Sequence, residues 1–130
     1  MIDLSFINHL HLLLNPYDKL HHLECDGLTH VIHRVLSDEN IEHTIYTGRV
    51  IYSFNDEHIP IHYWIDIDNI RIDYRAKMWL GDAPDIPHGI FYPTDYPSIS
   101  YQGSHTQLTL LPHIIIQEII NPYPAINDYV

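Results

Sequence analysis

The chain contains a single cysteine, Cys25, and the residue types that could activate its thiol. A cysteine attacks as the thiolate, whereas a free thiol with a pKa near ~8.5 is mostly protonated at neutral pH. The positive end of a helix and a nearby imidazolium both lower that pKa. Cys25 begins a run with helical spacing, and His62 lies in a run with strand alternation. We therefore take Cys25 as the candidate nucleophile and His62 as its base.

The stretch from Ile61 to Arg75 alternates apolar and polar residues on both sides of Asp68 and Asn69, which predicts a β-hairpin. If Asp68 and Asn69 form the turn, the expected pairs are Ile67 with Ile70, Asp66 with Arg71, Ile65 with Ile72, and Trp64 with Asp73. One face of this hairpin is apolar and belongs on a core. The other face is polar and carries the histidine.

On that polar face, Asp73 lies diagonal to His62 and within reach of its side chain. A carboxylate that holds the second ring nitrogen of an imidazole completes a set of nucleophile, base and orienting residue. Asp66 shares this face and is the alternative orienting residue. Its cross-strand partner Arg71 would engage it first, so the sequence favours Asp73.

The surrounding elements follow from hydrophobic spacing. Residues 3–14 and 25–36 have helical periodicity, and residues 44–52 have the β-branched and aromatic character of a strand. Gly48 inside that strand indicates a bulge or a close approach. We expect residues 107–111 to form a strand and Pro112 to open a helix that runs to Ile120.

Residues 79–101 are rich in proline, glycine and aromatic side chains, which predicts a long ordered loop with one short strand. We expect this loop to border a substrate cleft. Trp64, Trp79 and His88 are the candidate cleft residues, although buried or rim positions are the commoner fate of such tryptophans.

Composition limits the classes of function. A length of 130 residues predicts one domain over residues 1–130, with 45% hydrophobic residues and a formal charge of −11. Such a charge repels phosphate backbones and anionic lipid surfaces, so we expect neither nucleic acid nor membrane as a partner. The first fifteen residues lack the basic region of a signal peptide, and a lone cysteine requires no oxidising compartment. These features favour the cytoplasm.

Several segments resemble one known group of enzymes. Residues 25–36 resemble the cysteine-bearing helix of the transglutaminase-like and papain-fold superfamily, and residues 40–48 resemble the glycine-containing strand that follows it. The run from His62 to Asp66 resembles the histidine strand, and Ile72 to Tyr74 resembles the aspartate strand. The resemblance implies an α+β, papain-like fold in which N-terminal helices pack on an antiparallel sheet of about four strands. It also implies that Cys25, His62 and Asp73 form a catalytic triad.

The chain departs from that pattern at several positions. Asp26 follows the cysteine where transglutaminases usually carry a tryptophan, and the cysteine motif of the arylamine acetyltransferases is missing. The glutamine that papain-type proteases place before their cysteine is not found either. The resemblance therefore implies no residue for the oxyanion hole beyond a backbone N–H at the start of the cysteine-bearing helix.

Twelve histidines offer a rival interpretation as a metal-binding module. His30 and His33 are neighbours on the same predicted helix, and His21 and His22 precede Cys25 closely. A zinc site needs three or four convergent ligands, and both the Cys-x-x-Cys pair and the His-Glu-x-x-His helix are absent from the sequence. We therefore expect scattered surface histidines, with no metal and no other cofactor.

The sequence thus predicts thiol-dependent acyl transfer or hydrolysis on an amide bond, with a peptide or protein as substrate. Protease, deamidase and transglutaminase chemistry remain open, as does the oligomeric state. The alternative is a catalytically silent acidic interaction or inhibitor protein with the same fold.

Overall fold

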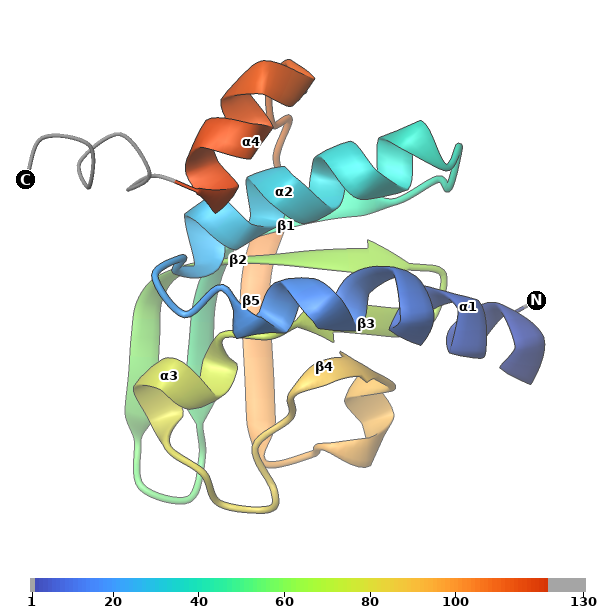
Figure 1. Ribbon diagram of the computed structural model, residues 1–130. Helices are drawn as coiled ribbons and strands as arrows, with labels where there is room; N and C mark the ends of the chain where they lie inside the picture. Colours follow the sequence, from blue (N-terminus) through green and yellow to red (C-terminus); the bar gives the residue numbers. More distant parts are fainter. Residues whose placement is uncertain (1, 122–130) are drawn as a thin grey trace, which may run out of the picture.

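The computed structural model describes residues 2–121 (Figure 1). The two helices expected from periodicity are present as α1 (Leu4–Leu14) and α2 (Cys25–Asp38), joined by the 3-10 turn η1 (Asn15–Lys19). The side chain of Asp3 caps α1 by accepting a 2.9 Å hydrogen bond from the N–H of Phe6. Pro16 lies where the α-helix gives way to the 3-10 turn.

The described residues form one five-stranded antiparallel sheet with the order β4-β3-β2-β1-β5. Its strands are β1 (Thr44–Tyr52), β2 (Glu57–Ile67), β3 (Ile70–Asp73), β4 (Gly89–Phe91) and β5 (Ile99–His105). The turn at Asp68 and Asn69 is confirmed, and so are the expected pairs Ile67–Ile70, Asp66–Arg71 and Ile65–Ile72. The architecture is α+β, as predicted, with one strand more than expected.

The strand expected at residues 107–111 is wrong, because the last strand, β5, ends at His105. Beyond Thr106 the chain leaves the sheet, and backbone carbonyls of residues 107–111 accept hydrogen bonds from side chains of α2. His33 bonds to the carbonyl of Leu108 at 3.1 Å, and Arg34 bonds to that of Leu111 at 3.3 Å. The helix α4 (His113–Ile120) then follows Pro112 as expected.

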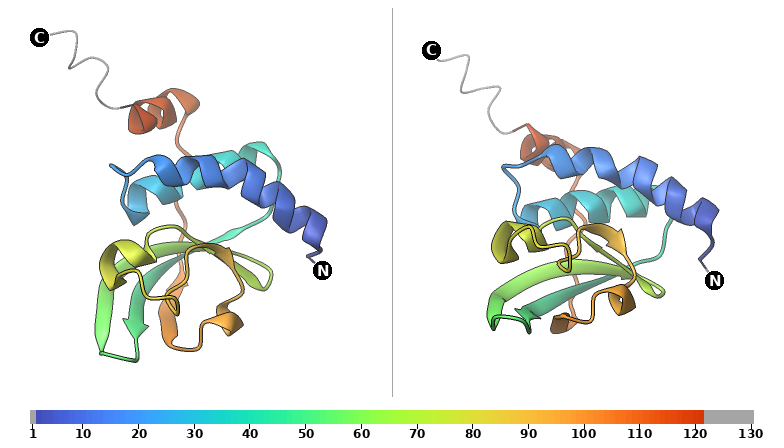
Figure 2. Two further views of the ribbon diagram at one scale, coloured as in Figure 1. Left: turned by 60° about the horizontal axis from the view of Figure 1, so that its bottom comes forward. Right: turned by 90° about the horizontal axis from the view of Figure 1, so that it is seen from below.

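Helices α1, α2 and α4 lie together on one side of the sheet (Figure 2), over the core that contains Ile65, Ile67 and Ile72. The short helix α3 (Ala76–Leu80) contributes Ala76 and Leu80 to a second apolar cluster with Val50, Ile59, Trp64 and Ile99. The segment between α3 and β5 contains a second 3-10 turn, η2 (Pro93–Asp95). The polar face of the hairpin is covered as well: His62, Trp64 and Asp73 are buried, and Asp66 and Arg71 are half-buried.

A β-bulge in β2 determines where His62 points. Gly48 of β1 pairs with His62, whereas Val50 pairs with Ile59, so two residues of β2 stand opposite Arg49 alone. Pro60 and Ile61, the two residues of the bulge, are exposed, while Ile59 and His62 on either side are both buried. The bulge thus shifts the alternation by one residue and turns the imidazole toward the interior.

None of the helices in residues 2–121 combines the length and the hydropathy that crossing a lipid bilayer requires.

Candidate functional site

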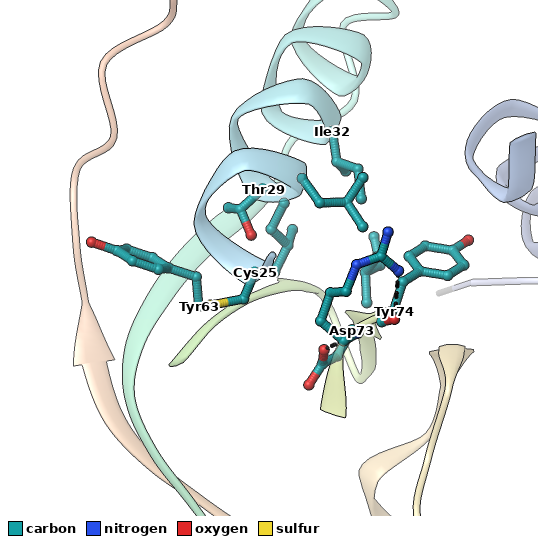
Figure 3. A pocket seen from close by; sticks show the side chains of 10 residues that line it. Cys25, Thr29, Ile32, Tyr63, Asp73 and Tyr74 are labelled. Carbon is teal, nitrogen blue, oxygen red and sulfur yellow. Dashed lines mark hydrogen bonds between the residues drawn. The ribbon is translucent and has the colours of Figure 1, made fainter. Parts of the chain in front are cut away.

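Cys25 is the first residue of α2, directly after the N-cap residue Glu24, and its side chain is half-buried. The first N–H groups of a helix have no partner within the helix, so the thiol lies at its positive end. Figure 3 shows Cys25 at the tip of α2, where it lines a small cavity together with Tyr63 and Asp73.

Asp73 and His62 form a buried pair, with exposed fractions of 4% and 0%. The ring Nε2 of His62 donates to Oδ2 of Asp73 at 2.8 Å. β3 ends at Asp73, so β3 does not pair with the part of β2 that carries His62. α2 packs against β2, and this brings its first residue near the imidazole.

Burial alone would raise the pKa of Asp73, but the charge of His62, followed by the hydrogen bonds from His62, Tyr101 and the N–H of Arg75, holds that pKa below its usual range. Oδ2 accepts from His62 and, at 2.7 Å, from the hydroxyl of Tyr101, while Oδ1 accepts from the backbone N–H of Arg75 at 2.9 Å. The carboxylate is therefore ionised and fixed from both sides.

Burial would lower the pKa of His62, but the charge of Asp73 and its hydrogen bond, with a further contribution from Cys25, raise that pKa to about 10. Because Nε2 is bonded to Asp73, Nδ1 is the nitrogen left for the thiol. Nδ1 is buried and forms no hydrogen bond within the described residues, so its contact with Cys25 is looser than a formed hydrogen bond. Catalytic hydrogen bonds are often long before substrate binds.

Arg75 fixes the chain that leads into Cys25, a role that sequence reasoning missed. Its buried guanidinium donates to the carbonyls of Leu23, Leu20, Asp18 and Tyr74 and to the carboxylate of Asp18, at 2.7–3.2 Å. These bonds use all five N–H groups that an arginine carries. The segment before α2 is therefore tied to the end of β3, the same point that holds Asp73.

Asp66 does not contact His62. It accepts two hydrogen bonds from Arg71, at 2.7 and 2.9 Å. Arg71 in turn lies over the rings of Trp64 and Tyr101, with its Cζ 5.7 Å and 4.6 Å from their centroids. The alternative orienting residue is thus engaged by its cross-strand partner, and Asp73 is the carboxylate that meets the imidazole.

The three candidate cleft residues lie in different environments. Trp64 lies in the core at 2% exposure, because the bulge and α3 cover its face of the sheet. Trp79 is half-exposed on α3. His88 bonds to Asp18 at 2.7 Å and lines an open cavity of about 430 Å³ together with Tyr74, Arg75 and Met78. The expectation for Trp64 is not met, whereas His88 does border a cavity.

A much smaller cavity touches the candidate nucleophile itself. Cys25, Thr29, Tyr63 and Asp73 line it with their neighbours, and its volume of about 10 Å³ is near the minimum for one water molecule. Tyr74 and Arg75 line both cavities. A substrate carbonyl would therefore reach the sulfur from the larger cavity only if side chains between the two move aside.

The histidines do not assemble a metal site. His33 and His43 bond to each other at 2.7 Å, and each also bonds to a backbone carbonyl. Within residues 2–121 no three side chains of the types that ligate metals are placed to hold an ion. The ring nitrogens of His33 and His43 are instead used in structural hydrogen bonds.

No protein-family model, no curated protein and no solved structure matches the chain.

Proposed function

We propose that this protein is a thiol enzyme that carries out acyl transfer or hydrolysis on an amide bond. The observation that supports the proposal is the convergence of Cys25 at the tip of α2 with a buried His62–Asp73 pair. This arrangement supplies a nucleophile, a base and an orienting residue, each from a different element. A peptide or protein is the expected substrate.

In the first half-reaction the Cys25 thiolate attacks the carbonyl carbon, and a C–S bond forms while the carbonyl electrons move to oxygen. A backbone N–H at the start of α2 is the donor best placed for that oxyanion. When the oxyanion collapses, the C–N bond breaks and the leaving amine takes the proton from the imidazolium of His62. The product of this step is a thioester on Cys25.

In the second half-reaction His62 is neutral and accepts a proton from the incoming nucleophile. Water then gives a carboxylic acid, and an amine gives a new amide bond, with the Cys25 thiolate as leaving group in both. Asp73 keeps the ring oriented throughout and stabilises each imidazolium that forms. Hydrolysis, deamidation and cross-linking use the same residues and differ only in the acceptor.

The fold proposed for this chemistry is papain-like, of the transglutaminase-like type. The chain order supports it: a cysteine-bearing helix, a glycine-containing strand, a histidine strand and an aspartate strand follow one another and pack as an antiparallel sheet under the helix.

Covalent labelling tests the proposal directly, because Cys25 is the only thiol in the chain. At pH 6–7 the wild type should react with iodoacetamide faster than free cysteine does, since the proposed mechanism places the imidazolium of His62 beside the thiol. His62→Gln should bring the rate down to that of free cysteine, and His58→Gln, an exposed position on the same strand, should not. Mass spectrometry follows the adduct, and Cys25→Ser is the blank.

A second candidate is a catalytically silent acidic protein that binds a basic partner. The formal charge of −11 favours it, and so does the narrowness of the cavity at Cys25. The labelling experiment separates the two: a wild-type rate no greater than that of free cysteine removes the thiol enzyme and leaves the binding protein.

A further inference from the structure

Tyr101 of β5 reaches the candidate site through a hydrogen bond to Asp73. Its hydroxyl donates to Oδ2 of Asp73 at 2.7 Å, and the same oxygen accepts from Nε2 of His62 at 2.8 Å. β5 is the strand farthest from β3 in the sheet order, on the other side of β2 and β1. The contact therefore joins strands that are not neighbours in the sheet and depends on the pairing of β5 with β1.

The Tyr101 ring is held on several sides. The ring of Trp64 meets it edge to face with centroids 4.9 Å apart, and the guanidinium of Arg71 lies 4.6 Å from its centroid. Burial, and then the neighbouring charge of Asp73, raise the pKa of Tyr101 well above its usual value. Its hydroxyl thus keeps its proton at neutral pH and remains a donor to the carboxylate.

We propose that Tyr101 is a positioning residue of this site: its hydroxyl holds the shared oxygen of Asp73 in place and limits how strongly that oxygen binds the imidazole proton. Two donors on one oxygen compete for its electron density, so each hydrogen bond is weaker than it would be alone. The effect on turnover rests on the proposed function, whereas the effect on the His62–Asp73 bond does not.

The consequence for catalysis lies in the first half-reaction, at the proton transfer from His62. His62 must give up its proton to the leaving amine and later take one from water. An aspartate that accepted from His62 alone at Oδ2 would hold the imidazolium more firmly and slow the transfer of its proton to the leaving amine. By sharing that oxygen, Tyr101 brings the basicity of His62 closer to the range in which general acid and base catalysis work well.

Nuclear magnetic resonance of the protein labelled with ¹⁵N-histidine tests the inference without any substrate. In Tyr101→Phe the Nε2–H of His62 should resonate further downfield at pH 7, because its bond to Asp73 strengthens. The ring ¹⁵N shifts near pH 10 should show His62 more protonated than in the wild type, with an acid dissociation constant about tenfold lower. His62→Gln identifies the signals.

Tyr46→Phe is the matched control. Tyr46 also packs on Trp64, with centroids 5.9 Å apart, but its hydroxyl forms no hydrogen bond within the described residues. A merely structural role for Tyr101 predicts similar losses of thermal stability in the two variants and no movement of the His62 signals. Unmoved or upfield signals in folded Tyr101→Phe overturn the inference.

A second substitution covers the case in which Tyr101→Phe does not fold. 3-Fluorotyrosine placed at position 101 alone keeps the shape of the ring and makes the hydroxyl a stronger donor. It should move the His62 signals in the opposite direction, upfield at pH 7, and a downfield movement overturns the inference. Because Cys25 reactivity is measured separately by labelling, failure of the thiol chemistry is not confused with failure of this hydrogen bond.

Discussion

At the residue scale, three hydrogen-bond donors converge on the carboxylate of Asp73. His62 and Tyr101 donate to one oxygen, and the backbone N–H of Arg75 donates to the other. A buried carboxylate in this setting orients the imidazole and stabilises its charged form. The pKa of His62, raised to about 10, depends chiefly on that carboxylate once burial is overcome. Removing the charge at Asp73 should therefore lower the reactivity of the Cys25 thiol through its effect on His62.

We expect Asp73→Asn to slow alkylation of Cys25 at pH 7 to near the rate of free cysteine, as His62→Gln does, a loss of at most about 30-fold because a free thiol with a pKa near ~8.5 is already a few per cent ionised at that pH. Asp66→Asn is the control, because Asp66 lies on the same hairpin and binds Arg71 instead. Circular dichroism establishes that both variants fold. Equal labelling rates in the two variants would show that Asp73 does not act on the thiol.

Not all of these residues could be found from the sequence. Alternation around Asp68 and Asn69 placed His62 diagonal to Asp73, and that contact exists. Tyr101 and Arg75 carry no such local signal. The role of Tyr101 depends on the pairing of β5 with β1. The role of Arg75 depends on the segment just before α2, which lies much earlier in the sequence and packs against Arg75 in the fold. Long-range pairing of this kind leaves no periodicity in a single sequence.

At the element scale, a break in the alternation of β2 positions the candidate base. Strict alternation from Ile59 would put Ile61 inward and His62 outward, yet the bulge exposes Ile61 at 72% and buries His62. Gly48, which the sequence marked as a bulge or close approach, is the residue opposite His62. The glycine thus predicted an irregularity, while its effect on the imidazole became clear only from the register.

Gly48 also faces Gly103 of β5 across the sheet. A Cβ at Gly48 would lie 2.2 Å from the carbonyl oxygen of Gln102, a contact that backbone atoms must relieve by moving. We expect Gly48→Ala to lower the free energy of unfolding by about 1–3 kcal/mol, the usual cost of overpacking, and to slow Cys25 labelling because His62 is displaced. Urea denaturation measures the first effect and alkylation the second.

Gly27→Ala provides the contrast within α2. A Cβ there would lie 3.1 Å from the end of the flexible Leu23 side chain, and alanine favours a helix over glycine by about 1 kcal/mol. This variant should be as stable as the wild type or slightly more so. A Gly48→Ala protein that matched it in stability would mean that β1 and β5 do not approach as closely as described.

At the scale of the whole molecule, two apolar clusters lie on opposite faces of one sheet, and the candidate base is buried between them and the tip of α2. A histidine in that position makes folding depend on pH. The native state holds a proton on His62 up to about pH 10, whereas an unfolded histidine releases it near ~6.5. Between these values the native state binds the extra proton, so stability falls as pH rises.

We therefore expect the free energy of unfolding to decrease from pH 6.5 toward pH 10, by at most about 1.4 kcal/mol for each pH unit from His62 alone. His33 acts in the opposite sense: burial, followed by the charge of His43, lowers its pKa, so its contribution is lost as the pH falls below ~6.5. Stability should be greatest near pH 6.5.

Urea denaturation of the wild type and of His62→Gln across this range measures how the free energy of unfolding changes above and below pH 6.5. The alkaline slope should flatten in His62→Gln but persist in His58→Gln, and a slope that survives the loss of His62 would assign it to other groups.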